Sequence, residues 1–334
     1  MPKLLTPPEW APQEWLWIGF PHLTEEWPGY LEAAQQQIAR FASAVADSGQ
    51  AVRLLVRGEA NEERARALVS SKVTLEQRVY GDIWLRDTGP LVVFEDGQRV
   101  ARRFGFNGWG GKYEMPGDAT IGAQLAKDAG LAIQTSPMIL EGGAIDTDGT
   151  GCAITTEQCL LEPNRNPAMT QDAIEAELFE RLGFDRVVWL GKGLVNDHTD
   201  GHVDNLARFV APGRVVVPEA SGADDPNAPI YADAAVRAVA AELDVVRIPS
   251  PGRIERGGAV EPASYVNFAI TTHLVVVPTF GTAYDADGVA AIAALFADRD
   301  TIGLPAEAVL AGGGGFHCAS QHMPLAPERP FSLG

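Results

Sequence analysis

Hydrophobic and polar residues follow two different periods along the chain, and the two periods alternate repeatedly. Residues 30–47 have the apolar spacing of an amphipathic helix that ends before Gly49, and residues 51–57 (AVRLLVR) have the pattern of a strand. Further helices are predicted at residues 119–129, 171–182, 231–243 and 289–298, and further strands at residues 186–190 and 245–248. The pattern therefore predicts an α/β protein.

Four β-hairpins are predicted between these helices. Three have clear turn sequences, at Glu95–Gln98, at Asp148-Gly149 and at Ala211–Gly213, and the fourth lies within residues 264–280. Four residues near the hairpin starts, and a fifth in the last glycine-rich segment, recur at intervals of 53 to 63 residues. They are Asp87, Glu141, His202, Tyr265 and Cys318. A period of this size predicts a five-bladed α/β propeller, because a closed ring of units leaves few sheet edges unpaired.

The alternative to a ring is an ordinary α/β sheet in which the spacing is a coincidence. No Ser-rich or Gly-rich linker divides the chain, so residues 1–334 are expected to form a single domain. The longest apolar run, Val289–Ala297, has nine residues, whereas a helix that spans a membrane needs about 20. We therefore expect no membrane partner.

Composition narrows the class of partner. The 26 Lys and Arg residues against 44 Asp and Glu residues give a formal net charge of −18. Such a field repels nucleic acid and attracts a small cation. The N-terminus carries no apolar signal sequence, and the three cysteines include no C-x-x-C pair, so a cytoplasmic protein without a structural zinc site is expected.

Cys318 is the strongest candidate for a reactive group. It follows Gly312–Gly315, Phe316 and His317, and glycines let the backbone approach a ligand closely. A cysteine on such a loop beside a histidine is a candidate thiolate nucleophile. The alternative is a small buried apolar residue, which is the interpretation we give to Cys152 and Cys159.

An imidazole and a carboxylate lie two residues apart at His202 and Asp204. Alternation of polar and apolar residues predicts a strand here, which would place both side chains on one face. The preceding residues Asp197, His198 and Asp200 make this run dense in metal-ligand types, so a metal-dependent hydrolase remains an alternative.

A closed ring of units would bring the polar residues near the hairpin starts, and Asp204, together at one end of its central axis. These residues are Asp87, Glu141, His202 and Cys318. Carboxylates around a thiol raise its pKa unless a cation is present, and a planar guanidinium matches carboxylate oxygens in pairs. The residues alone therefore favour a thiol-dependent hydrolase or transferase that acts on a guanidine.

Seven segments resemble the agmatine deiminase family, also called the bacterial-type peptidylarginine deiminase family, of the guanidine-modifying pentein superfamily. They are DIWLRDTGP, FNGWGGKY, EGGAIDTDG, TTEQCLLEPNRNP, DHTDGHVDNLARF, PASYVNF and GGGGFHCASQ. The resemblance implies the five-bladed α/β propeller of the penteins. It also implies hydrolysis of agmatine to N-carbamoylputrescine and ammonia without a metal or cofactor, a reaction of polyamine (putrescine) biosynthesis.

The resemblance also implies roles for individual residues. Cys318 matches the family nucleophile, His202 the acid/base and Glu141 its carboxylate partner, whereas Asp87 and Asp204 match the pair that binds the guanidinium. Trp84 and Trp109 are expected to stack on the substrate cation or to line the pocket, with a core or rim position as the alternative for each.

The sequence departs from the family pattern close to the nucleophile. Gly315-Phe316 stands where Asn-Ile is expected, and His322 where Gln is usual. These changes leave open which residues bind the far end of the substrate, so a peptidylarginine deiminase remains an alternative, as does a non-catalytic propeller that binds a partner. The expected partner is a small cationic guanidine, and a homo-oligomer is compatible with the sequence.

Overall fold

The computed structural model describes residues 3–326, which form five small α/β units. In the first unit, β5 (Leu91–Glu95) pairs antiparallel with β6 (Gln98–Gly105). Helix α5 (Asp118–Asp128) then leads into β7 (Ala132–Ile139), which pairs parallel with β6. The short strand β1 (Leu4–Leu5) extends this sheet beside β5. The unit is thus a hairpin, a helix and a parallel strand.

The same motif recurs in three further units. Each has an antiparallel pair, a helix and a strand parallel to the second strand of the pair. Their elements are β8 (Asp146–Thr147), β9 (Cys152–Thr155), α7 (Gln171–Leu182) and β10 (Arg186–Trp189); β11 (Arg208–Ala211), β12 (Arg214–Glu219), α8 (Ala228–Ala240) and β13 (Asp244–Pro249); and β16 (Ala269–Ile270), β17 (Leu274–Thr279), α9 (Asp285–Ala293) and β18 (Asp300–Pro305).

The last unit joins two segments that are distant in the sequence. β19 (Ser320–Pro324) pairs antiparallel with β2 (Gln13–Gly19), and helix α1 (Leu31–Asp47) connects β2 to its parallel neighbour β3 (Ala51–Val56). The hairpin of this unit therefore has no direct connection along the chain. Only tertiary pairing holds its two strands together.

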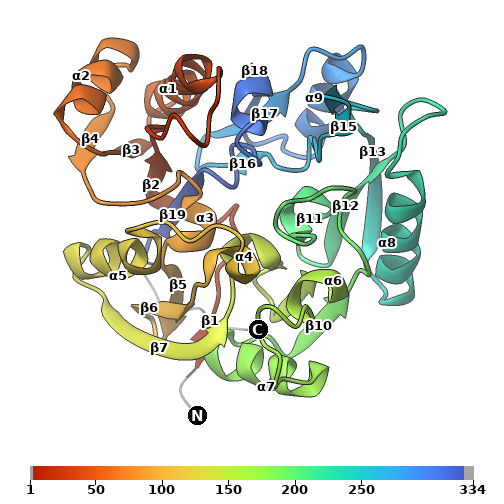
Figure 1. The fold of residues 1–334 in the computed structure, drawn as a ribbon. Helices are drawn as coiled ribbons and strands as arrows, with labels where there is room; N and C mark the ends of the chain where they lie inside the picture. Colours follow the sequence, from red (N-terminus) through yellow and green to blue (C-terminus); the bar gives the residue numbers. More distant parts are fainter. Residues whose placement is uncertain (1–2, 327–334) are drawn as a thin grey trace.

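Short elements complete the fold. They are α2 (Glu59–Leu68), β4 (Thr74–Gln77), α3 (Leu85–Thr88), α4 (Gly108–Gly111), η1 (Gly142–Ala144), α6 (Glu157–Leu160), η2 (Val203–Asn205), β14 (Glu255–Arg256), β15 (Ala259–Val260) and α10 (Glu307–Leu310). Helices α1, α5, α7, α8 and α9 lie on the outside of the molecule, and α3 and α4 lie near its middle (Figure 1). Across residues 3–326 the sheets stay separate, and none closes on itself.

Most elements predicted from periodicity are confirmed within a few residues, including the five helices and the four hairpins. The predicted strand through His202 and Asp204 is wrong. Those residues lie at the 3-10 turn η2, where the backbone N–H groups of Leu206 and Ala207 both donate to the carbonyl oxygen of Val203. Polar and apolar residues of this segment are all buried, so its alternating sequence does not reflect the two faces of a strand.

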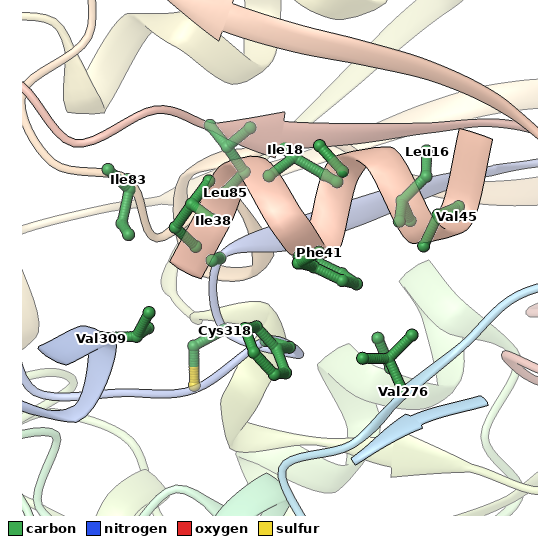
Figure 2. Close-up of a cluster of buried hydrophobic side chains, with 14 of the residues drawn as sticks. Leu16, Ile18, Ile38, Phe41, Val45, Ile83, Leu85, Val276, Val309 and Cys318 are labelled. Atoms are coloured by element: carbon green, nitrogen blue, oxygen red, sulfur yellow. The ribbon is translucent and has the colours of Figure 1, made fainter. Parts of the chain in front are cut away.

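A hydrophobic cluster supports the glycine-rich loop of residues 312–318. Ile38 and Phe41 of α1 pack with Leu16 and Ile18 of β2, and all four side chains are fully or almost fully buried. Burying an aliphatic or aromatic side chain stabilises a fold by about 1.5–3 kcal/mol. Cys318 lies at the edge of this cluster, with its sulfur turned away from α1 (Figure 2). The core therefore fixes the Cys318 backbone and leaves its thiol facing the middle of the molecule.

None of the helices within residues 3–326 has the length and apolar character needed to cross a membrane.

Candidate active site

The predicted polar residues lie at equivalent places in their units, just before the first strand of each hairpin. Asp87 is on α3, before β5, and Glu141 precedes η1 and β8. His202 and Asp204 flank the start of η2 before β11, and Cys318 precedes β19. All five side chains are buried, the most accessible being Asp87 with 7% exposed.

Gly143 shows how closely three of these groups converge. A Cβ atom at this position would lie 2.5 Å from Nδ1 of His202, 2.9 Å from Oδ1 of Asp87 and 3.0 Å from Oδ2 of Asp204. Its backbone N–H donates to Oδ1 of Asp87 over 3.0 Å. Nδ1 of His202 and Oδ1 of Asp87 are 3.7 Å apart. Asp87 of the first unit and His202 and Asp204 of the third unit thus meet at Gly143 of the second unit, which has no side chain.

The thiol of Cys318 faces both an amide and a carboxylate. Nδ2 of Asn267 donates to Sγ over 3.0 Å, and Oδ2 of Asp204 lies 3.4 Å from Sγ. Burial raises the pKa of the Cys318 thiol well above its usual value, and the charges of Asp204 and Asp87 act in the same direction. Without a cation in the site, Cys318 is therefore a neutral thiol.

The imidazole of His202 is also neutral. Burial lowers its pKa to about 3, although the nearby charge of Asp204 opposes this effect. Neither ring nitrogen has a hydrogen-bond partner among the described residues. His202 therefore donates no hydrogen bond to Glu141, its expected carboxylate partner, although an oxygen of Glu141 comes within 4.8 Å of a ring nitrogen.

Glu141 instead binds an arginine that sequence reasoning missed. Nε of Arg165 donates to both carboxylate oxygens, over 2.9 and 3.0 Å. The guanidinium also contacts Oδ2 of Asp200 at 3.1 Å and the carbonyl oxygen of Thr199 at 2.6 Å. Burial raises the pKa of Glu141, and Arg165 opposes that rise. The available signal was the segment EPNRNP, in which Arg165 is the only basic residue.

Trp109 fixes the orientation of Asp87. Its indole Nε1 donates to Oδ2 of Asp87 over 3.0 Å. Trp109 adopts φ 54° and ψ 54° within α4, a left-handed conformation that is uncommon for a residue other than glycine. Burial raises the pKa of Asp87 well above its usual value, and Asp204 and Glu141 add to the rise. The raised pKa of Asp87 therefore reflects the cost of a negative charge in a buried site beside Asp204 and Glu141.

A cavity of about 140 Å³ leads to Cys318. Its walls consist of Glu26, Asp82, Trp84, Asp87, Trp109, Tyr113, His198, Thr199, Ala311, Gly312, Gly313 and Cys318. Both predicted tryptophans thus line it, and Trp84 also belongs to the hydrophobic core. Neither Lys nor Arg is among the described residues of the wall. The cavity therefore offers carboxylates and aromatic rings.

The run from Asp197 to Asp204 does not converge as a metal site. Asp197 accepts hydrogen bonds from the backbone and hydroxyl of Thr199, and Asp200 pairs with Arg165 and Lys112. Within residues 3–326, the group with ligand atoms close enough for a metal is Glu141, Cys159 and His202. Both oxygens of Glu141 are already bound to Arg165, so this group is poorly suited to a cation.

The fold and the site together define an α/β protein with a buried thiol, imidazole and carboxylate centre between its repeated units. The sequence model of the family described as Porphyromonas-type peptidyl-arginine deiminase matches residues 5–324. The chain therefore belongs to this family, and the resemblance drawn from the seven segments is confirmed.

Named relatives span the same length. A protein of Vibrio parahaemolyticus with the provisional name agmatine deiminase is 34% identical, covering 95% of this chain and 96% of its own. The agmatine deiminase structure from Enterococcus faecalis, described as catalysing its reaction, has a TM-score of 0.90 and 28% identity and covers 96% of both chains. A cysteine-to-serine variant of C. jejuni agmatine deiminase with substrate bound has a TM-score of 0.91 and 27% identity, covering 97% of both chains.

More distant structures share the fold alone. An amidinotransferase from Microseira wollei covers 99% of this chain and 98% of its own, with a TM-score of 0.55 and 13% identity. A dimethylarginine dimethylaminohydrolase covers 93% of this chain and 100% of its own, with a TM-score of 0.56 and 12% identity.

Proposed function

We propose that this protein hydrolyses the guanidinium group of agmatine, giving N-carbamoylputrescine and ammonia. The observation that carries the proposal is the convergence of His202, Asp87 and Asp204 around Gly143, with the thiol of Cys318 against Asp204. A flat cation with several N–H donors is the ligand that such a pair of carboxylates favours. The names of relatives that match almost the whole chain support the same reaction.

We propose further that the five units form the blades of one α/β propeller and one catalytic domain, residues 1–334. Support comes from the motif common to the five sheets and from the pairing of β19 with β2. The site draws its groups from all five units, so we expect no smaller part of the chain to be active. All three cysteines are free, which is consistent with a reducing, cytoplasmic location.

The first chemical step begins when the substrate cation enters between Asp87 and Asp204. A positive charge there offsets the two carboxylates that raise the pKa of Cys318. The thiol then transfers its proton to the neutral imidazole of His202, which forms a thiolate and an imidazolium. Substrate binding thereby creates the nucleophile, which limits side reactions of the thiol in the empty site.

The thiolate of Cys318 then attacks the central guanidinium carbon and forms a C–S bond. His202 gives its proton to one terminal nitrogen, the C–N bond breaks and ammonia leaves. An S-alkylthiouronium cation remains on Cys318. Asp87, oriented by Trp109 and Gly143, and Asp204 hold this cation flat through charge-assisted hydrogen bonds.

Water completes the reaction. Neutral His202 takes a proton from water, and the hydroxide adds to the same carbon. Collapse of this intermediate breaks the C–S bond, and the proton of the added hydroxyl returns to sulfur. The ureide leaves, and His202 loses its proton to solvent, where ammonia takes it up. In this scheme Glu141 acts by holding Arg165 and by its negative charge near His202, without a direct hydrogen bond.

Agmatine is preferred over arginine because of the charges in the outer cavity. Glu26 and Asp82 line it, and burial raises the pKa of Asp82 to about 7, with Asp118 and Glu26 adding to the rise. A primary ammonium group at this position would keep Asp82 ionised and pair with it. The carboxylate of arginine would meet these acids with no Lys or Arg among the described lining residues, at a cost of several kcal/mol.

Side-by-side kinetics test the substrate. Ammonia and ureide release are measured with agmatine, free arginine and a blocked arginine dipeptide. We expect kcat/KM for agmatine to exceed that for arginine by at least about a hundredfold, or about 2.7 kcal/mol. Equal or better turnover of arginine would overturn the proposal, and preference for the dipeptide would assign the protein to peptidyl-arginine instead.

A second measurement separates thiol from metal chemistry. Cys318→Ser should lose measurable turnover, whereas extensive chelation of the wild-type protein should leave turnover unchanged. Cys152→Ser, which alters a thiol remote from the cavity wall, is the matched control and should keep wild-type kinetics. Loss of activity on chelation that a divalent ion restores would contradict the thiol mechanism.

A further inference from the structure

His317 lies between two buried carboxylates directly before the nucleophile. Nδ1 of its ring is 2.7 Å from Oδ2 of Asp204, and Nε2 is 2.7 Å from Oε2 of Glu9. The His317 side chain is 2% exposed, so both contacts are shielded from water. The imidazole thus links a site carboxylate to a residue near the start of the chain.

Both partners of the imidazole are ionised. Burial alone would raise the pKa of Asp204, but the hydrogen bond and charge of His317 bring the pKa below its usual value. Burial would likewise raise the pKa of Glu9, but Arg208, His317 and Arg86 hold it well below. An ionised carboxylate only accepts hydrogen bonds. The two ring nitrogens of His317 therefore each contact a hydrogen-bond acceptor, one on Asp204 and one on Glu9.

Glu9 is a fixed anchor for the imidazole ring of His317. Its Oε2 accepts from Nη2 of Arg208 over 2.8 Å and pairs with Nη2 of Arg86 at 3.1 Å. Its Oε1 accepts the backbone N–H of Ile270 over 2.8 Å. Contacts from three separate segments leave this carboxylate no room to rotate, so His317 keeps its ring orientation.

The consequence appears at Asp204. Its Oδ2 is occupied by His317, whereas its buried Oδ1 has no hydrogen-bond partner among the described residues. Rotation of the carboxylate would break the hydrogen bond to His317. The free oxygen therefore remains in one place, available to an N–H group of a guanidinium.

Other charged groups surround this pair on every side. Those that face His317 or Asp204 are Arg86, Asp87, Asp146, Asp197, His202, Arg208, Cys318 and His322. Oδ2 of Asp204 has two hydrogen-bond partners among the described residues, the ring of His317 at 2.7 Å and the thiol of Cys318 at 3.4 Å. Removal of the nearer partner, His317, should therefore make Asp204 easier to protonate, in spite of the remaining cations.

We propose that His317 is a positioning residue: held by Glu9, it keeps Asp204 ionised and oriented for the substrate guanidinium. The proposal rests on the proposed function, because it assigns Asp204 to guanidinium binding. His317 contacts Asp204, and neither residue belongs to the described wall of the cavity, which ends at Asp87 and Cys318.

The kinetic test uses His317→Gln. We expect kcat/KM for agmatine to fall at least about tenfold, mainly through KM, because Asp204 binds the guanidinium before the chemical step. The acidic limb of the kcat/KM profile should move to higher pH, since an Asp204 that is easier to protonate loses its charge at a higher pH. An unchanged limb, or a loss confined to kcat, would overturn the proposal.

His322→Gln is the matched control. Nδ1 of His322 lies 3.4 Å from Nη1 of Arg86, so this half-buried histidine contacts the same network, and no contact with Asp204 is found among the described residues. The acidic limb of the kcat/KM profile of His322→Gln should lie at the same pH as that of the wild-type protein. An equal displacement in both variants would mean that any disturbance of the network has this effect, which would overturn the specific role of His317.

A measurement on the wild-type protein does not depend on turnover. ¹⁵N NMR of protein labelled at histidine should show a ring that is hydrogen-bonded at both nitrogens, and its signals should be missing from the spectrum of His317→Gln. Absence of such a ring would overturn the proposal. Absence of agmatine turnover with the signals present would instead contradict the proposed function and leave the bridge from Glu9 to Asp204 intact.

Discussion

The side-chain amide of Asn267 donates a hydrogen bond to Sγ of Cys318 over 3.0 Å. Its carbonyl oxygen accepts the backbone N–H groups of His317 and Cys318, at 3.1 and 3.3 Å. Asn267 thus holds the backbone of His317 and Cys318 in place and also donates a hydrogen bond to the sulfur of Cys318. It precedes β16 and provides the contribution of the fourth unit to the site.

Asn267→Ala should slow the reaction by removing this donor. A hydrogen bond to a charged group contributes about 1.5–3 kcal/mol, so kcat/KM should fall about tenfold to a hundredfold. Asn166→Ala is the control, because among the described residues the side chain of Asn166 bonds to the backbone of Ile139 and not to a proposed site residue. The control should lose thermal stability and keep its kinetics, and equal kinetics in the two variants would remove Asn267 from the site.

Asp87→Asn and Asp204→Asn should each reduce kcat/KM by at least about a hundredfold. Each substitution keeps the side-chain shape and removes one anion that faces the cation, and an unpaired buried charge costs about 3–5 kcal/mol. Steady-state kinetics with agmatine measure the effect, and the exposed Asp172 on α7 provides Asp172→Asn as the control. A normal rate in either site variant would exclude that residue from substrate binding.

The thiol of the empty site should react slowly with iodoacetamide. Because burial, Asp204 and Asp87 raise the pKa of Cys318, the thiolate fraction and the alkylation rate should still be rising with pH above 9. Removal of an anion lowers the pKa, so Asp87→Asn should be alkylated faster than wild type at pH 8 while it hydrolyses agmatine more slowly. Mass spectrometry of the modified Cys318 follows the rate, and a plateau near pH 7 in the wild type would contradict this description.

Gly143→Ala should abolish turnover without unfolding the protein. The new Cβ would lie 2.5 Å from Nδ1 of His202, so His202, Asp87 or Asp204 must move. We expect a loss of at least about a hundredfold in kcat/KM, because shifts near 1 Å in a site can cost this much. Gly257→Ala, at φ +59° with no atom within 4 Å of its Cβ, should lower Tm and spare the kinetics. Wild-type turnover in Gly143→Ala would show that the three groups need not converge.

Local pattern was enough to predict the repeated units. Amphipathic periodicity predicted helices α1 and α7, and turn residues such as Asp148-Gly149 predicted hairpins. The spacing of the residues near the hairpin starts predicted the repeat of the units. Cys318 was found because its glycine run signals a close approach of the backbone to a ligand. These features depend on residues that are neighbours in the sequence.

The partners of the site residues could not be predicted in this way. Arg165 reaches Glu141 across 24 residues, Asn267 reaches Cys318 across 51, and Glu9 reaches His317 across 308. A single sequence carries no signal for such pairs, because each residue alone resembles an ordinary polar surface residue. The turn at His202 was missed for a related reason: its alternation reflects the burial of polar groups in the site, which mimics a strand.

The pairing of β19 with β2 has a consequence for synthesis on the ribosome. Every other strand of residues 3–326 is translated before β19, so the edge of β2 that receives it stays unpaired until then. Exposed strand edges promote aggregation, and contacts between distant segments form slowly. Because Cys318 lies two residues before β19, its thiol reaches the other candidate site residues in the same late event. Activity and protection of this edge should therefore appear together on the nascent protein.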